Sequence, residues 1–509
     1  MKSAQASQLV RLAWIVVATV VAPTGCKQPQ PHANLGQIYN DAAQAPDYLR
    51  NPVIVIPGIL GSRLVDDQTG QVVWGTFDRK SASPKEPEGI RRISLPMAEG
   101  TPLYRLQDSI RPDGPLDQLN VRILGVPIHV QAYSQILSSL GVGGYRDSQT
   151  RSDLSVAYTD KHFTCFQFDY DWRRDISETA QQFDKFVLAR EKYVIEEMRN
   201  RYGLVMQDVK FDIVAHSMGG LLARYYLRYG GQPLPKDGSL PQLTWAGSRH
   251  VKHTVLVGTP NAGSAVSFRE LIEGSRLSKV LPIYPPAVIG TFPAAYQLLP
   301  SPGQQAIIDA TDATQPVNIY DPALWKKMRW GLASPDQDKV LRAMLPDVAD
   351  RESRLGIAID HQRKCLARAE QFHAALDVPG KPPGESSLHL YAGDAVETDS
   401  IVSADLLSGK IEVVSKSAGD GTVTRASANG RGQVGKDSLL GQRPSPIRWS
   451  SKVFLPSDHL DLTRNPVFVD NVLSLLLESS PVDYRQTPMS PTPLPERVPI
   501  RGLSRLPPP

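Results

Sequence analysis

The sequence predicts a large α/β domain with a mostly parallel central sheet, and two observations support this fold class. First, short apolar runs at 51–56, 163–168 and 253–257 alternate with helical segments such as 177–202. This alternation is typical of a parallel sheet that helices cover on both faces. Second, a chain of 509 residues, of which 41% are hydrophobic, can bury one large core.

Composition and charge exclude other classes. Lys and Arg total 56 against 52 Asp and Glu, the net charge is +4 and no long basic run occurs, so no nucleic-acid partner is expected. Zinc-type spacing is absent, and we expect no metal and no cofactor. Besides Cys26, the chain contains only Cys165 and Cys365. A buried free thiol at Cys165 is favoured, and a bridge between these two cysteines stays open.

The first residues predict an export signal over 1–26. Basic residues precede an apolar run at 12–22, which is too short to span a bilayer comfortably. The run ends in Pro-Thr-Gly-Cys, which resembles the lipobox of bacterial lipoproteins, although Pro23 stands where that motif usually has Leu. We therefore expect export to the bacterial cell envelope with a lipid anchor at Cys26, or secretion after ordinary signal cleavage.

The rest of the chain divides by composition. Residues 27–50 are polar and predict a linker, and 51–478 carry the strand and helix pattern of the domain. An irregular insertion at 62–125, rich in Pro and Gly, predicts a lid. A second insertion at 264–385 predicts a cap, and its apolar and aromatic residues would suit acyl chains, although a plain structural subdomain fits each segment equally well. The proline-rich residues 479–509 predict a disordered tail.

A strand-turn-helix pattern at 209–226 contains the candidate nucleophile, Ser217. An apolar run leads into Ala-His-Ser-Met-Gly, and helical spacing follows. The pattern is that of a nucleophile elbow, in which small residues two before and two after the serine let neighbouring backbones pass. Ala215 and Gly219 hold these positions, so the first departs from the usual glycine. The alternative is a structural turn in which Ser217 only caps the helix.

The first apolar strand ends in a turn that can bind an oxyanion. Residues 51–62 break at Pro57-Gly58, and Gly61 follows shortly after. Such a turn can direct main-chain N–H groups at one point, as stabilising a tetrahedral intermediate requires. The alternative is a plain tight turn after the first strand.

The base and the acid follow from chain order. In enzymes with a nucleophile elbow the order is serine, acid, histidine, and His459 is the only histidine after either candidate acid. The other histidines near strands, and His216 in the elbow, are poorer candidates. Asp420 is favoured as the acid because the glycines on both sides of it let its loop approach an imidazole closely. Asp394 has a similar position after the preceding strand and is the alternative.

Together these motifs resemble the lecithin:cholesterol acyltransferase family, which includes lysosomal phospholipase A2 and phospholipid:diacylglycerol acyltransferases. The resemblance rests on the segments 55–62, 170–173, 215–220, 258–260 and 419–423, and on His459 followed by Asn465-Pro466. It implies an α/β-hydrolase core with lid and cap and the triad Ser217, Asp420 and His459. It also implies that the main-chain N–H groups of Ile59 and Met218 bind the oxyanion.

The family further implies transfer of a fatty acyl group from a glycerolipid donor to an alcohol or to water, at a membrane or lipid surface. We expect a lipid O-acyltransferase that acts through a serine acyl-enzyme, and a phospholipase or lipase that uses water is the alternative. A non-catalytic, lipid-binding surface lipoprotein is the alternative of another class. One departure concerns the lid, which a disulfide closes in the animal members. No cysteine lies between Cys26 and Cys165.

Overall fold

The computed structural model describes residues 38–77, 82–116, 118–123, 126–131, 134–148, 162–275, 283–302, 304–384, 386–431 and 445–478. The predicted signal at 1–26, the anchor at Cys26 and the tail at 479–509 lie outside these residues. Among the helices that the structure describes, none is long and apolar enough to cross a membrane. The described cysteines, Cys165 and Cys365, are both buried and free, so the bridge left open by the sequence does not form.

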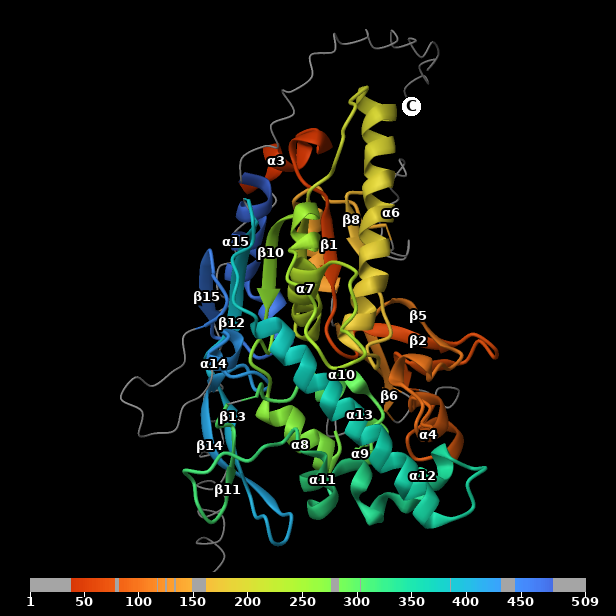
Figure 1. The fold of residues 1–509 in the computed structure, drawn as a ribbon. Helices are drawn as coiled ribbons and strands as arrows, with labels where there is room; N and C mark the ends of the chain where they lie inside the picture. Colours follow the sequence, from red (N-terminus) through yellow and green to blue (C-terminus); the bar gives the residue numbers. More distant parts are fainter. Residues whose placement is uncertain are drawn as a thin grey trace, which may run out of the picture.

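A six-stranded sheet forms the centre of the molecule (Figure 1). Its strand order is β15-β12-β10-β9-β1-β8, and every neighbouring pair is parallel. The predicted fold class is therefore confirmed. The strands are β1 (Val53–Ile56), β8 (Cys165–Gln167), β9 (Phe211–His216), β10 (Val251–Val257), β12 (Ser387–Gly393) and β15 (Ser451–Leu455).

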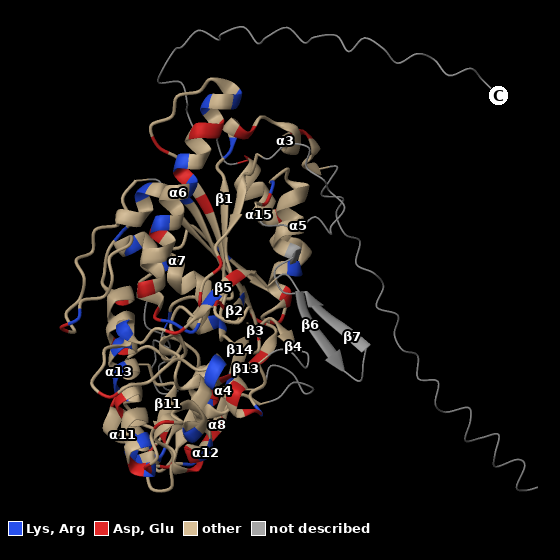
Figure 2. Ribbon diagram, turned by 90° about the vertical axis from the view of Figure 1, so that its right-hand side faces the viewer, with Lys and Arg blue, Asp and Glu red and all other residues tan. Residues whose placement is uncertain are grey.

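Helices cover both faces of this sheet (Figure 2). The helices α6 (Ile176–Tyr202) and α7 (Met218–Tyr229) lie on one face, and α3 (Asn40–Gln44), α5 (Ser134–Val142) and α15 (Pro466–Glu478) lie on the other. Successive side chains of a strand point to opposite faces. In β1, accordingly, Ile54 and Ile56 belong to the hydrophobic cluster that includes α7, and Val53 and Val55 belong to the cluster that includes α15.

The described structure begins inside the segment that we expected to be a linker. Residues 40–49 contain α3 and the short helix η1 (Asp47–Leu49), and both contact the domain. The Tyr39 hydroxyl donates to Asp470 of α15 at 2.9 Å, and Arg50 pairs with the buried Asp47. These contacts hold the entering chain against the domain before β1 begins.

The predicted lid region is more regular than the sequence indicated. The strands β2 (Ser62–Asp66), β3 (Val72–Trp74) and β5 (Ile110–Pro115) form an antiparallel sheet. The strands β4 (Thr76–Phe77), β6 (Gln118–Ile123) and β7 (Val126–Gln131) form a mixed sheet, in which β4 and β6 are parallel and β6 and β7 antiparallel. The helices α4 (Pro87–Ile93) and η2 (Leu103–Arg105) lie between β4 and β5 in the chain. The expectation of an irregular insertion was wrong, because these segments pair as strands and bury large side chains, such as the cross-strand pair Leu64 and Trp74.

The predicted cap region is mostly helical and lies beyond the carboxyl ends of the central strands (Figure 1). It contains α8 (Ala265–Glu273), α9 (Pro286–Ile289), α10 (Pro293–Tyr296), α11 (Pro322–Met328), η4 (Gly331–Ala333), η5 (Pro335–Gln337), α12 (Asp338–Met344) and α13 (Arg351–Asp377). The longest of these, α13, begins where the Asp350 carboxylate accepts a hydrogen bond from the Ser353 N–H.

The strand after β12 does not join the central sheet. β11 (Ile307–Asp309), β13 (Val396–Ala404) and β14 (Ile411–Gly419) form a separate sheet, in which β13 and β14 are antiparallel. The short helices η3 (Ala246–His250), α14 (Arg425–Ala428) and η6 (Asp461–Arg464) complete the described elements. Asp420 directly follows β14, so this small sheet positions the candidate acid.

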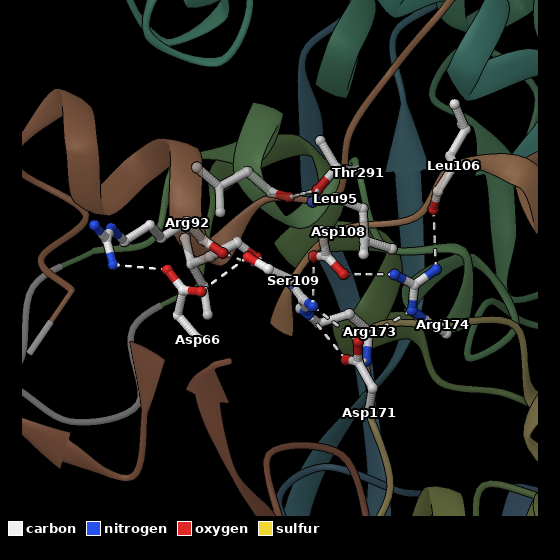
Figure 3. A network of polar contacts seen from close by, with 12 residues as sticks. Asp66, Arg92, Leu95, Leu106, Asp108, Ser109, Asp171, Arg173, Arg174 and Thr291 are labelled. Carbon is white, nitrogen blue, oxygen red and sulfur yellow. Dashed lines mark hydrogen bonds and ion pairs between the residues drawn. The ribbon is translucent and has the colours of Figure 1, made fainter. Parts of the chain in front are cut away.

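A buried polar network fastens the lid region to the core (Figure 3). The Arg173 guanidinium is fully buried and contacts Asp171 and Asp108, each at 2.8 Å. Arg174 donates to the other Asp108 oxygen at 2.6 Å and to the Leu106 carbonyl at 3.0 Å. These carboxylates raise the pKa of Arg173, which therefore stays charged. Because Asp108 precedes β5 and Asp171 follows β8, the network connects the lid to the end of a core strand.

The lid is also connected to the cap. The main-chain N–H of Leu95, which follows α4, donates to the Thr291 hydroxyl at 3.0 Å (Figure 3). Thr291 is fully buried between α9 and α10. Lid, core and cap therefore meet in one place, beside the carboxyl ends of the central strands.

Candidate active site

Ser217 lies between β9 and α7, at the centre of the sheet. Its backbone has φ 54° and ψ −127°, a conformation that residues other than glycine rarely adopt. A hydrogen bond of 2.8 Å from its N–H to the Val257 carbonyl of β10 holds the turn. This is the strained strand-to-helix turn of a nucleophile elbow, and it lifts the serine hydroxyl above the strand ends.

Close backbone packing explains the small residues of the elbow. A Cβ at Gly219 would lie 2.4 Å from the Pro57 carbonyl oxygen, and a Cβ at Gly220 would lie 1.9 Å from the Thr259 hydroxyl oxygen. Ala215 is fully buried in β9, between Ile56 of β1 and Leu256 of β10. A methyl group fits there, so the departure from the usual glycine leaves the turn intact.

The structure brings His459 to Ser217. The loop after β15 places the His459 Nε2 atom 2.9 Å from the Ser217 Oγ atom and the Nδ1 atom 2.8 Å from Asp420 Oδ2. A carboxylate only accepts hydrogen bonds, so we assign the proton of the neutral imidazole to Nδ1. The Nε2 lone pair is then free to accept the serine proton.

Asp420 is held by its own loop. It is 2% exposed, and its Oδ1 atom accepts hydrogen bonds from the N–H groups of Thr422 at 2.9 Å and Val423 at 2.7 Å. The Asp420 carbonyl accepts from the His459 N–H at 2.9 Å. With Oδ1 occupied in this way, Oδ2 faces the imidazole.

The alternative acid lies elsewhere. The carboxylate of Asp394 is 29% exposed and pairs with the Arg425 guanidinium at 3.4 Å. Of the two aspartates that the sequence offered, the structure places Asp420 beside His459. A Cβ at Gly393, which precedes Asp394, would lie 2.6 Å from the Asp420 Cβ, so the end of β12 also needs a glycine for this loop to approach.

A second histidine, which the sequence argument set aside, supports the loop of the first. The Nε2 atom of His216 lies 3.0 Å from the His459 carbonyl oxygen, and because a carbonyl only accepts, Nε2 carries the proton. Burial, together with the nearby His459, lowers the pKa of His216 to about 3, so its ring is neutral. The only sequence signal for this role was its position next to Ser217.

The predicted oxyanion donors lie at the same opening. Ile59 follows β1 and lines the cavity beside Ser217, and Met218 is the first residue of α7. Within the described residues, the main-chain N–H groups of Ile59 and Met218 make no hydrogen bond. Both are therefore available to an oxygen that carries negative charge, and the N-terminus of α7 favours such a charge.

Ser217 and His459 open into a cavity of about 270 Å³. Its walls come from the turn after β1, the lid, the core and the cap, and they are mainly apolar: Ile59, Leu60, Trp74, Ile93, Trp172, Leu271, Tyr284, Ile289, Phe292 and Leu298. The Trp172 ring is in edge-to-face contact with Trp74 at 5.4 Å and with Phe292 at 5.7 Å. An apolar pocket with a few polar groups at one point is typical of a site for a lipid-like molecule.

Within the part of the chain that the structure describes, no group of three or more His, Cys, Asp and Glu residues could hold a metal ion. At one end of the cavity, Ser217, His459 and Asp420 form a continuous chain of hydrogen bonds. Such a chain can transfer a proton away from a hydroxyl and back to a leaving group.

Comparison with known families identifies relatives of this arrangement. The model of the family "Lecithin:cholesterol acyltransferase" matches residues 130–336. The resemblance to the lecithin:cholesterol acyltransferase family is confirmed. The matched range contains the elbow and much of the cap, and it supports an enzyme that acts on lipid esters by acyl transfer or hydrolysis. It ends before Asp420 and His459, so their assignment depends on the geometry described above.

One solved structure supports the fold. A chain from the crystal structure of the Tle4–Tli4 complex is similar with a TM-score of 0.50 at 15% identity, covering 84% of this chain and 99% of that one. EstA from Clostridium botulinum (TM-score 0.29, 11% identity, 85% and 88% covered) and lipase 1 from Pelosinus fermentans (0.28, 12%, 85% and 99%) are more distant. Among the curated proteins, none matches this chain.

Proposed function

We propose that the protein is a lipid O-acyltransferase that moves a fatty acyl group from a glycerolipid to an alcohol through an acyl-enzyme on Ser217. One observation carries the proposal. Ser217, on a strained elbow, is hydrogen-bonded to the His459 imidazole, which the buried Asp420 carboxylate orients. The serine and the imidazole open into an apolar cavity between lid and cap. The family match agrees with this chemistry.

The first half-reaction forms the acyl-enzyme. His459 Nε2 takes the Ser217 proton while Oγ attacks the carbonyl carbon of the lipid ester. The negative charge that develops on the carbonyl oxygen is met by the N–H groups of Ile59 and Met218. When the tetrahedral intermediate collapses, the ester C–O bond breaks, and the imidazolium gives its proton to the departing lipid oxygen. Asp420 stabilises the imidazolium and holds its orientation.

The second half-reaction uses the same groups in reverse. The hydroxyl of an acceptor gives its proton to His459 and attacks the acyl-enzyme carbonyl, and Ser217 recovers the proton as it leaves. An alcohol acceptor gives a new ester, and water gives a fatty acid. The aromatic walls of the cavity support transfer, because an apolar alcohol would contact them near the acyl-enzyme, whereas water gains nothing from such walls.

The test measures both products. Vesicles that contain an acyl-labelled phospholipid and an unlabelled sterol or diacylglycerol are incubated with the protein, and the label is followed into free fatty acid and neutral ester. We expect label in the ester pool, and a loss of roughly 10⁴-fold or more in Ser217→Ala. Ser408→Ala, at an exposed turn serine outside the site, is the matched control.

Each other outcome assigns a different function. Label in fatty acid alone, dependent on Ser217, would identify a phospholipase or lipase. Label in neither pool, with vesicle binding retained, would favour a non-catalytic lipid-binding protein. Activity that is unchanged in Ser217→Ala would contradict the catalytic assignment, since the roles of His459, Asp420, Ile59 and Met218 all depend on this serine.

We further propose that the protein acts in the bacterial cell envelope, exported by residues 1–26 and anchored through a lipid on Cys26. The basis is the sequence pattern of an export signal that ends in Gly-Cys. An anchored enzyme would meet its glycerolipid donor at the membrane surface, where such lipids are concentrated.

A further inference from the structure

One side of α8 brings polar groups into the apolar cavity. Ser264, Ser267 and Glu270 follow one another at intervals of three residues, and Ser275 lies just beyond the helix end. Residues three apart share a face of a helix, and all four residues line the cavity that contains Ser217. Phe268 of the same helix is fully buried in the core and fixes its rotation.

Two of these side chains have an oxygen atom to which no described residue bonds. The Glu270 Oε1 atom accepts a hydrogen bond from the Ser275 hydroxyl at 2.7 Å, and Ser264 caps the helix. Among the residues that the structure describes, no group bonds to Oε2 of Glu270 or to the Ser267 hydroxyl. The neighbouring Arg269 is engaged by Asp399 and Glu273 and does not pair with Glu270.

These polar groups stand in a mainly apolar cavity wall. Burial in that wall raises the pKa of Glu270, which means that the wall disfavours its charge. Among the described residues no side chain bonds to the Ser267 hydroxyl or to Glu270 Oε2, so both are available to a molecule in the cavity. The acyl-transfer steps on Ser217 use neither side chain. A ligand that supplies hydrogen bonds at this point of the cavity would find partners there.

We propose that Ser267 and Glu270 form a subsite that binds a hydrogen-bond-donating group, a hydroxyl or an ammonium, of the lipid that enters the cavity. Whether the Glu270 carboxyl is protonated or ionised, one of its oxygens can accept a hydrogen bond from a ligand hydroxyl or ammonium. The Ser267 hydroxyl can accept or donate. This subsite names the class of lipid that the proposed reaction would use. The inference therefore rests on the proposed function for the reaction itself. Lipids with a free hydroxyl or ammonium near the ester are favoured over lipids in which these groups are capped.

The first test measures binding and needs no turnover. Calorimetric titration below the micelle concentration compares 1-O-decylglycerol with its 2,3-di-O-methyl ether, neither of which has an ester. We expect the free diol to bind roughly tenfold more tightly, about 1.4 kcal/mol, in agreement with one to two hydrogen bonds. Ser267→Ala and Glu270→Met should each reduce this preference, and the double variant should abolish it.

The matched control is Glu273→Met, three residues after Glu270 at the last position of α8. Its carboxylate is 47% exposed and lies outside the cavity, so the preference should stay unchanged. Glu270→Met approximately keeps the side-chain volume and removes the carboxyl, and a thermal melt verifies that the variant folds. Equal binding of both ethers to the unaltered protein, no binding of either, or an undiminished preference in the double variant would overturn the subsite. These results would not depend on whether Ser217 is a nucleophile.

A second test distinguishes the donor lipid from the acceptor as the source of the group. Without an acceptor, kcat/KM is compared for phosphatidylethanolamine, which has ammonium N–H groups, and phosphatidylcholine, which has none. With an alcohol acceptor, the ratio of ester to fatty acid is measured. If the subsite binds the headgroup of the donor, Glu270→Met reduces the preference in kcat/KM for phosphatidylethanolamine over phosphatidylcholine. If the subsite binds the acceptor, Glu270→Met lowers only the ratio of ester to fatty acid. No change in either quantity would overturn the proposal.

Discussion

The reactive serine occupies a backbone conformation that is held by its neighbours. A residue other than glycine in a sparsely populated φ, ψ region costs about 1–3 kcal/mol and persists only where the surroundings impose it. At Ser217 the surroundings are the N–H contact to Val257 and the two close approaches that require Gly219 and Gly220. The strain keeps the hydroxyl out of a normal helix-capping position and directs it to His459.

At the same scale, the role of Asp420 can be tested by removing its charge. In Asp420→Asn the side-chain oxygen should keep the bonds from Thr422 and Val423, and the amide would then face His459 Nδ1 as a donor. That contact favours the wrong imidazole tautomer, and kcat should fall roughly 10⁴-fold. Steady-state kinetics with a labelled lipid ester measures the loss. Asp394→Asn is the control, with a much smaller effect, and the reverse ranking would move the acid to Asp394.

At the scale of elements, β9 is held by a buried carboxylate near its start. Asp212 accepts hydrogen bonds from the Asn51 amide at 3.2 Å and from the His253 N–H of β10 at 3.0 Å. It therefore connects the strand of the elbow to the segment before β1 and to β10. Asp212 is 1% exposed, and burial raises its pKa to about 7.

This raised pKa predicts a pH dependence of stability. Between about pH 4, the ordinary Asp pKa, and pH 7, the folded protein binds the Asp212 proton more tightly than the unfolded chain does. The contribution of this group to the free energy of unfolding therefore falls as pH rises through that window, by an amount on the order of 4 kcal/mol. Asp212→Asn should remove the fall. Denaturant unfolding of both proteins from pH 4 to 8 measures the difference, and parallel pH profiles would contradict the prediction.

The lid and the cap also act as elements. The lid supplies Trp74 and Ile93 to the cavity and is held through Arg173 and Thr291, while the cap supplies α8 with its polar side. The sequence has no cysteine in the lid region for the disulfide that the family resemblance led us to look for. Here the charged network around Arg173 connects the lid to the core, so a cysteine bridge is not required for an ordered wall.

At the scale of the whole molecule, the candidate site is assembled from four parts of the chain. Ile59 comes from the first strand-turn, Ser217 from the centre of the sheet, Asp420 from the small sheet and His459 from the loop before the last helix. The insertions between these parts do not interrupt the central sheet. The insertions leave the central sheet at the carboxyl ends of its strands and cover the site there. Open α/β sheets bind their ligands at this edge.

The proposed anchor belongs to this scale, because it determines which surface the molecule meets. Radiolabelled palmitate should enter the protein in vivo and should be lost in Cys26→Ala, which lacks the thiol that would carry the lipid. Immunoprecipitation and autoradiography measure the label. Cys365→Ala is the control, because this thiol is buried and should not be labelled. Equal labelling of wild type and Cys26→Ala would contradict the anchor.

Local patterns in the sequence determined much of this molecule. The alternation of strand and helix predicted the parallel sheet, and the Ala-His-Ser-Met-Gly turn predicted the elbow, because both depend on residues within one or two elements. The helix expected at 177–202 is α6, and the apolar run at 253–257 lies in β10. His459 was singled out by chain order alone, before any distance was known.

Tertiary structure decided what depends on residues far apart in the chain. Only packing of the loop after β14 against the loop after β15 places Asp420, and not Asp394, beside His459. Only the contacts of the lid with Arg173 and the cap turn a region read as irregular into an ordered cavity wall. Likewise, only the fold places Ser267 and Glu270 of α8 in the wall of the cavity that contains Ser217. The physical reason is common to all three. Burial and hydrogen-bond partners are set by neighbours in space, which spacing along the chain does not specify.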